Sequence, residues 1–274
     1  MKEGPLKINL REIMNKRLGT RSKLVPAFLL HGLERLVRQE ELNHILEVAY
    51  PAEGSAFSRK VLDELGITLD VRGLENLPSG EAFEFVSNHP LGGLDGIALV
   101  GILGGKYGDE NIRVLVNDML MNVEPLRKVF LPVNKYGSQG REAARAIGEA
   151  YASGKQIVMF PAGLVSRRQP DGSIRDLTWQ KSCVVKALES GRRMVPVHFE
   201  GLNSNKFYNL AYWRKKLGIG INLEQALLPS ELCASKGASY RVTFGPPVDP
   251  AVYREKGKSP AVIAEMLRRY LYKL

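Results

Sequence analysis

The chain has few cysteines and no long apolar segment, and each shortage excludes a class of protein. Cys183 and Cys233 are the only cysteines, too few for a disulfide framework and not at a metal-binding or redox spacing. No apolar run reaches the ~18 residues of a membrane-spanning helix. No small-residue cleavage site follows the apolar run at residues 24–30, so we expect no signal peptide. We therefore expect a chain of the reducing cytoplasm that does not cross a membrane. Internal repeats and low-complexity tracts are also missing.

Acidic residues are scarce relative to basic ones. The 274 residues contain 29 Asp and Glu against 39 Lys and Arg, giving a net charge of +10 and a pI of about 9.6. This excess favours an anionic partner, such as membrane phospholipid, an acidic carrier protein or nucleic acid. No recognised nucleic-acid-binding motif accompanies it, so we predict no nucleic-acid partner. The length fits one large domain, or one domain with a helical appendage.

The basic excess is concentrated at the N-terminus. Residues 1–23 carry half of the net charge, and apolar residues interleave with the basic ones. A second apolar pattern at near-helical spacing follows Pro26, which fits the first turn of a helix. We predict that residues 1–55 form basic amphipathic helices that contact an anionic membrane surface, and that residues 56–274 form the main domain. An alternative is left open, in which these helices pack on the domain and their lysines are simply solvated.

From about residue 67, apolar strand patterns alternate with helical ones. The predicted strands are residues 67–73, 83–86, 112–116, 129–134, 156–160, 194–199 and 240–244. The predicted helices are residues 57–65, 97–103, 141–152, 179–189 and 260–272. This alternation predicts an α/β fold with a mostly parallel central sheet flanked by helices, preceded by the N-terminal amphipathic helical segment. Pro132 argues that its strand lies at an edge or ends there.

The stretch that organises the chain is residues 88–95, Asn-His-Pro-Leu-Gly-Gly-Leu-Asp, between a predicted strand and a predicted helix. It places His89 and Asp95 at the carboxyl end of a strand, where open α/β sheets bind their ligands. Imidazole titrates near neutral pH and can take a proton from a substrate hydroxyl, while a carboxylate on its second nitrogen fixes the tautomer. Pro90 restricts the backbone of His89 to extended angles. The alternative is an ordinary turn in which Asp95 only caps the helix.

A second candidate loop, residues 160–168, leaves a fully apolar strand through Phe160-Pro161-Ala162-Gly163. Gly163 allows close approach of backbone to a ligand. Ser166, Arg167 and Arg168 offer donors for an anionic or carbonyl group. The alternative is a plain turn with solvated arginines.

Residues 206–217 interleave aromatic and basic side chains. Tyr and Trp favour the membrane interface and Lys and Arg favour anionic headgroups. The same pattern also fits single-stranded nucleic acid or a helix with an aromatic core stripe, and these alternatives stay open.

Four motifs, in order, resemble those of the glycerolipid (1-acyl-glycerol-3-phosphate) acyltransferase superfamily. Residues 88–95 resemble its His-to-Asp motif, and residues 131–135 resemble its intermediate motif, with Lys135 where Arg is usual. Residues 160–163 resemble its Phe-Pro-Glu-Gly motif, and residues 195–197 its final Val-Pro-Val strand. The resemblance spans about residues 67–250. It is closest to a bacterial branch labelled as haemolysins, which includes O-acyltransferases of ornithine and glycine lipids.

The resemblance implies a site and its substrates. It implies that His89 is the general base and that Asp95 supports it, with an acyl thioester of acyl-carrier protein or CoA as donor, no bound cofactor and no metal. Backbone amides near Gly163 or in the Gly92-Gly93 loop are expected to stabilise the oxyanion. The residues expected to bind substrate are Asn88, Gly92, Gly93, Lys135, Phe160, Pro161, Gly163, Ser166, Arg167 and Arg168.

Three departures from the family pattern limit which acceptors we expect. Five residues separate His89 from Asp95 instead of four, an insertion that the two glycines can absorb. Ala162 replaces the family Glu, and Leu-Val replaces the usual Thr-Arg at residues 164–165, positions that the family associates with a phosphate-bearing acceptor. We therefore expect a lyso-lipid acceptor with an N-linked 3-hydroxyacyl chain on glycine or ornithine.

The predicted protein is thus a peripheral acyltransferase on the inner, cytoplasmic face of the plasma membrane. Its partners are the acyl donor, the lyso-lipid acceptor and an anionic membrane surface. The alternatives are 1-acyl-glycerol-3-phosphate acylation and a non-catalytic, haemolysin-like membrane protein.

Overall fold

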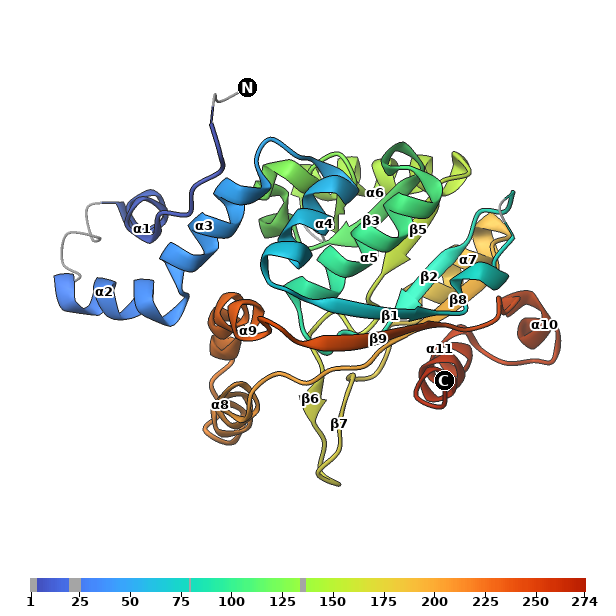
Figure 1. The fold of residues 1–274 in the computed structure, drawn as a ribbon. Coiled ribbons are helices and arrows are strands. Elements are labelled where there is room, and N and C mark those ends of the chain that lie inside the picture. The colour runs from blue at the N-terminus through green and yellow to red at the C-terminus, as the bar shows by residue number, and fades with distance from the viewer. Residues whose placement is uncertain (1–3, 20–25, 79, 134–136) are drawn as a thin grey trace.

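A seven-stranded sheet forms the centre of the computed structural model, which describes residues 4–19, 26–78, 80–133 and 137–274 (Figure 1). The strand order is β1-β9-β8-β2-β5-β3-β4, and every neighbouring pair is parallel except β8 and β9. The prediction of a mostly parallel α/β sheet is therefore confirmed. The strands are β1 Thr68–Arg72, β2 Glu84–Ser87, β3 Ile112–Val116, β4 Phe130–Pro132, β5 Gln156–Met159, β8 Met194–Phe199 and β9 Ser239–Phe244.

The strand positions follow from burial. All four residues of β2 are buried, as expected for a central strand covered on both faces. β1, at one edge, alternates between exposed and half-buried residues. β4 lies at the other edge and contains Pro132, as predicted, because an edge strand tolerates a missing N–H.

Helices cover both faces of the sheet (Figure 1). Helices α4 and α5 pack on each other over one face, and α6, α7 and α11 cover the other. The helices are α1 Leu10–Leu18, α2 Ala27–Leu36, α3 Gln39–Ala49, α4 Gly54–Glu64, α5 Gly93–Tyr107, α6 Gly137–Ala152, α7 Ser182–Ser190, α8 Asn205–Lys216, α9 Leu228–Ala234, α10 Pro250–Glu255 and α11 Pro260–Leu271. A two-stranded hairpin, β6 Arg167–Arg168 and β7 Ile174–Arg175, projects from the sheet.

Small residues allow α4 and α5 to pack closely. A Cβ at Gly104 of α5 would lie 2.6 Å from the Cβ of Ser55, and one at Gly101 would lie 3.4 Å from the Cβ of Ser58. A larger side chain at Gly104 would therefore push the helices apart. Because α5 begins in the loop that holds His89, this packing fixes the position of that loop relative to the core.

The N-terminal helices are attached to the domain through α3. The side chain of Asn43 pairs with the backbone N–H and C=O of Ile8, at 2.7 and 2.9 Å, and α3 buries Leu42, Ile45 and Ala49 in the main core. Helix α2 is different, because it buries Leu30 but exposes a row of large apolar residues. These are Phe28, Leu29, Leu33 and Leu36. The predicted division between residues 1–55 and 56–274 remains a prediction.

A buried acid makes the stability of this core depend on pH. Glu84 of β2 is fully buried near Tyr151 of α6, and burial raises the pKa of its carboxyl from 4.5 to about 8. The unfolded chain loses this proton above about pH 4.5 whereas the folded chain keeps it up to about pH 8, so the free energy of unfolding falls as pH rises through this window.

We expect Glu84→Gln to remove this pH dependence. The substitution should raise the free energy of unfolding at pH 7 by up to about 3 kcal/mol and have little effect at pH 4, since one pKa unit corresponds to about 1.4 kcal/mol. Urea unfolding at several pH values measures this, with the exposed Glu47→Gln of α3 as control. An equal effect of Glu84→Gln at both pH values would contradict the prediction.

Candidate active site

His89 and Asp95 meet in the loop between β2 and α5. The Nδ1 atom of His89 lies 2.8 Å from Oδ2 of Asp95, and the same carboxylate accepts the backbone N–H groups of Leu91 and Gly92 at 3.0 Å each. Asp95 is the third residue of α5, so its carboxylate also caps the helix. Asp95 therefore caps the helix and contacts His89 at the same time, so it does more than cap the helix.

The glycines absorb the extra residue of the loop. Gly92 has a φ of +77°, which only glycine adopts readily, and a Cβ there would lie 2.9 Å from Cδ2 of Leu228. Gly93 then begins α5. The His89–Asp95 contact therefore forms despite the longer spacing.

The surroundings of the pair favour one proton arrangement. Asp95 is fully buried, and burial raises the pKa of its carboxyl, an effect opposed by the hydrogen bonds from His89, Leu91 and Gly92. The side chain of His89 is 20% exposed. With Nδ1 engaged by Asp95, Nε2 is the free nitrogen, and it has no hydrogen-bond partner in the described part of the chain. The imidazole is thus arranged to accept a proton at Nε2 from a group outside the protein.

The second predicted loop lies directly beside the first, because β2 and β5 are parallel neighbours. The ring of Phe160, which follows β5, stacks on the imidazole of His89, with centroids 4.3 Å apart and an angle of 29° between the planes. Gly163 closes the turn after Phe160 with a φ of +68°, and its N–H donates to the Phe160 carbonyl at 2.9 Å. Phe160 and Asp95 together fix the orientation of the imidazole.

Asp176, which lies outside the site predicted from the sequence, also positions the loop. This buried carboxylate accepts the backbone N–H of His89 at 3.1 Å, the hydroxyl of Ser166 at 2.6 Å and the indole N–H of Trp179 at 2.9 Å. Ser166 in turn donates its backbone N–H to the carbonyl of His89 at 2.7 Å. Asp176 lies 87 residues after His89, and no motif marks it.

We expect Asp176→Asn to destabilise the fold. An amide presents one oxygen and one NH₂ group, so its NH₂ must face either Trp179 or the donors of His89 and Ser166, leaving a buried donor unpaired. The free energy of unfolding should fall by about 1–3 kcal/mol. Thermal or urea unfolding measures this, and Asp171→Asn, in the exposed turn between β6 and β7, is the matched control. Equal stability of the two variants would contradict the prediction.

Several residues predicted to bind substrate are engaged inside the protein. Both polar atoms of the buried Asn88 amide bond the backbone of Phe199, at 2.7 and 2.9 Å, and so link the ends of β2 and β8. Arg167 is buried and pairs with the buried Glu224 at 2.8 Å, so its placement does not match the predicted role in binding an anionic headgroup. Of the two predicted arginines, Arg168 is the exposed one. Lys135 lies outside the described residues.

Two of the backbone amides that were predicted to stabilise the oxyanion already have hydrogen-bond partners inside the protein. The amide of Gly92 donates to Asp95 and that of Gly163 donates to Phe160, so neither is free. The N–H of Gly93, at the exposed first position of α5, has no partner in the described ranges. This amide adds the partial positive charge of a helix N-terminus beside His89.

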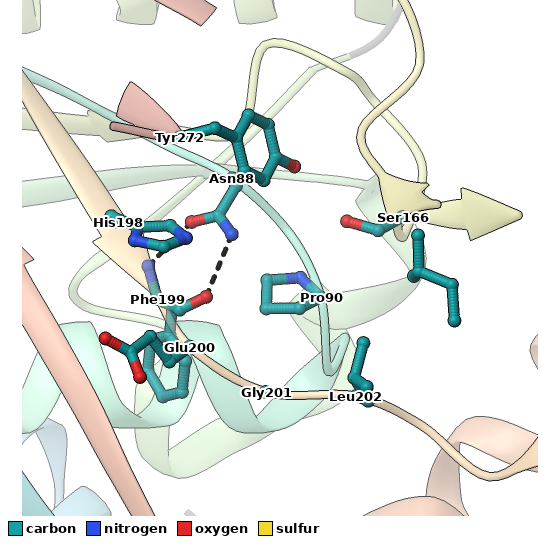
Figure 2. Close-up of a pocket in the computed structure, with 10 residues that line it drawn as sticks. Asn88, Pro90, Ser166, His198, Phe199, Glu200, Gly201, Leu202 and Tyr272 are labelled. Atoms are coloured by element: carbon teal, nitrogen blue, oxygen red, sulfur yellow. Dashed lines mark hydrogen bonds between the residues drawn. The ribbon is translucent and has the colours of Figure 1, made fainter. Parts of the chain in front are cut away.

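A cavity of about 240 Å³ adjoins the loop on another side (Figure 2). Asn88, Pro90 and Ser166 line it together with His198, the chain after β8 and Tyr272, the residue that follows α11. Nδ1 of His198 is buried without a partner among the described residues, and burial lowers the pKa of this imidazole. The cavity is lined by the residues on both sides of His89 but not by His89 itself.

Comparison with known proteins decides the family. The model of the family described as Acyltransferase matches residues 12–274. This chain belongs to that acyltransferase family. The predicted membership of the glycerolipid acyltransferase superfamily is confirmed. The prediction that this protein is an enzyme is confirmed with it.

Two curated relatives cover almost the whole acyltransferase. The lyso-glycine lipid O-acyltransferase of Phocaeicola vulgatus is 41% identical over 267 residues, which are 97% of this chain and 95% of the relative. That of Bacteroides thetaiotaomicron is 39% identical over 267 residues, 97% of each chain. The crystal structure of the 1-acyl-sn-glycerophosphate acyltransferase PlsC of Thermotoga maritima is 17% identical, with a TM-score of 0.50, over 96% of this chain and 95% of its own. At that identity the likeness concerns the fold alone.

Proposed function

We propose that this acyltransferase esterifies the free hydroxyl of a lyso-glycine lipid, an N-(3-hydroxyacyl)glycine, with a fatty acyl group from an acyl thioester. The observation that carries the proposal is the 2.8 Å contact between His89 Nδ1 and Asp95, which leaves Nε2 free to act as a base. The names of the two relatives, each about 40% identical over nearly all of this chain, support the acceptor class.

The reaction begins with a proton transfer. Nε2 of His89 takes the proton of the acceptor hydroxyl as its oxygen attacks the thioester carbonyl carbon, and Asp95 stabilises the imidazolium that forms. The tetrahedral intermediate then expels the thiolate, which takes the proton from Nε2. The products are the ester and a free thiol, and no metal or bound cofactor takes part.

The oxyanion of the intermediate needs a donor. We assign this role to the free N–H of Gly93, because the amides of Gly92 and Gly163 are already engaged. An oxyanion-hole donor typically contributes about 3 kcal/mol to transition-state stabilisation. The acyl donor is a thioester of acyl-carrier protein or of CoA.

The acceptor class agrees with the chemistry of the second loop. Ala162 is buried and apolar where the family motif has Glu, and Arg167 is held in a buried ion pair with Glu224. Of Arg167 and Arg168, only the exposed Arg168 is then available to bind the acceptor, and it matches the single negative charge of a glycine carboxylate. One arginine supplies fewer hydrogen-bond donors than the several expected in a site for a phosphate monoester.

The proposal places the enzyme at the inner face of the plasma membrane as a peripheral protein. The exposed apolar row of α2, formed by Phe28, Leu29, Leu33 and Leu36, supports contact with a bilayer. No helix in the described part of the chain is both long and apolar enough to cross a membrane.

An acyl-transfer assay read by mass spectrometry tests the proposal. Purified protein receives an acyl-carrier-protein or CoA thioester and either N-(3-hydroxyacyl)glycine, its ornithine counterpart or 1-acyl-glycerol-3-phosphate. We expect diacylated glycine lipid as the main product. Product from the phosphate acceptor alone would overturn the acceptor class, and no product from any combination of donor and acceptor would overturn the activity.

A further inference from the structure

A second exposed apolar surface lies far from α2 in the sequence, on α8 and the chain that follows it. The inner side of α8 buries Phe207, Tyr208 and Ala211. Its outer side and the next residues expose large apolar side chains, with Leu217 at 70% and Ile221 at 72% of full exposure. We name as the α8 surface the residues Tyr212, Trp213, Lys215, Lys216, Leu217, Ile219, Ile221 and Leu223.

The charge of this segment has one sign. Residues 201–223 contain no Asp or Glu. Lys215 and Lys216 are exposed, and the ammonium of Lys216 lies 4.9 Å from the centroid of the Trp213 ring. Arg214 instead turns inward and pairs with the buried Glu224 at 2.8 Å. The α8 surface therefore presents two lysines among aromatic and aliphatic side chains, with no acid exposed beside them in the segment.

This composition fits one occupant, an anionic phospholipid bilayer. Trp and Tyr favour the bilayer interface, Lys favours anionic headgroups, and Leu and Ile gain by entering the acyl region. Exposed apolar patches mark either protein or membrane interfaces. The combination of Trp, Tyr and Lys with the highly exposed Leu217 and Ile221 is the one typical of a bilayer interface, so we favour the membrane over an acidic protein.

The α8 surface and the active site lie on opposite sides of one small cluster. The buried face of α8 packs on Val165, whose side chain also borders Gly92 of the His89–Asp95 loop. The amide of Asn203, just before α8, donates to the carbonyl of Pro90 at 3.0 Å. In Figure 1, α8 and the β6–β7 hairpin extend from the same side of the sheet.

We infer that the α8 surface docks the enzyme on an anionic membrane and sets the distance between the bilayer and His89. This membrane contact is additional to the one proposed for the N-terminal helices. The inference rests on the proposed function only in that the acceptor is a membrane lipid. Docking through α8 brings the His89 loop toward the surface at which such an acceptor is held.

Vesicle binding tests the docking without any assay of turnover. Sedimentation uses vesicles of phosphatidylcholine with or without phosphatidylglycerol. We expect the wild type to bind the anionic vesicles, and Leu217→Ser/Ile221→Ser to bind about tenfold or more weakly because two aliphatic side chains leave the bilayer. Val252→Ser/Val262→Ser, which alters two exposed valines of α10 and α11, is the matched control and should bind like the wild type. Equal binding by the wild type and both double variants would overturn the inference.

The two tryptophans of the chain supply an independent readout. Trp179 is buried and Trp213 is 54% exposed. Anionic vesicles with brominated acyl chains should quench the fluorescence of the wild type but not that of Trp213→Phe. Absence of quenching in the wild type would place Trp213 outside the bilayer and overturn the inference.

Activity measurements separate the docking from the proposed function and from carrier binding. With a short-chain, water-soluble N-(3-hydroxyacyl)glycine, Leu217→Ser/Ile221→Ser should retain wild-type kcat/KM, and with acceptor in vesicles kcat/KM should fall about tenfold. A higher KM for the acyl-carrier thioester with the soluble acceptor, at unchanged vesicle binding, would assign the surface to the carrier protein and overturn the inference. Failure of all acyl transfer together with intact vesicle binding and quenching would overturn the proposed function and leave the docking supported.

Discussion

His89→Ala should abolish most of the turnover while leaving the protein folded. The substitution removes the base that takes the hydroxyl proton, and a positioned base typically contributes 10²–10⁴-fold to the rate, so we expect kcat to fall by about that factor. The imidazole is partly exposed and lies at the end of β2 rather than in the core, so the melting temperature should change little. Steady-state kinetics by mass spectrometry and thermal unfolding measure the two effects.

A second histidine supplies the control for this experiment. His44 of α3 is exposed and lies 3.1 Å from Glu64, so it resembles His89 in having a carboxylate partner but lies away from the loop. His44→Ala should keep wild-type kcat. Wild-type turnover by folded His89→Ala would show that another group removes the proton and would refute the mechanism.

Asp95→Asn should cause a loss of similar size for a different reason. The carboxylate accepts the proton on Nδ1 of His89, which keeps Nε2 unprotonated. An amide can donate to Nδ1 instead and stabilise the wrong tautomer, a change that costs about 10⁴-fold in the Ser-His-Asp triad. We expect kcat to fall by about 10³–10⁴-fold with a smaller change in KM.

The double variant His89→Ala/Asp95→Asn distinguishes a joint role from two separate ones. If Asp95 acts through the imidazole, adding Asp95→Asn to His89→Ala should cost little further activity, because groups that act as a unit are not additive. Multiplicative losses would indicate that Asp95 contributes independently. Asp63→Asn, an exposed position on α4, controls for loss of an acidic charge.

The local elements of this protein were predictable because each depends on neighbours in sequence. Apolar runs or apolar–polar alternation located the seven strands of the sheet, since a buried parallel strand needs a continuous apolar segment and a half-exposed edge strand alternates. The site was predictable in part for the same reason, because His89 and Asp95 are six residues apart and one loop brings them together. The burial of Glu84 does not follow from this pattern, since a single polar residue does not interrupt an apolar run.

Other features of the site needed the arrangement of the whole chain. The stacking of Phe160 on His89 depends on β5 being the neighbour of β2, which a strand pattern does not specify. Asp176 reaches the same loop from 87 residues away. The sequence predicts a free cation at Arg167, whereas the buried Glu224, 57 residues further along, pairs with it and also with Arg214.

By itself, the sequence determined the fold class, the family motifs and the His89–Asp95 pair. The tertiary structure decided which polar groups of the described site are free to act, such as Nε2 of His89 and the amide of Gly93, and which are used internally, such as Asn88, Arg167 and the amides of Gly92 and Gly163. The reason is physical. A buried polar group must find a partner, and that partner can come from any point in the chain that folding brings within about 3 Å.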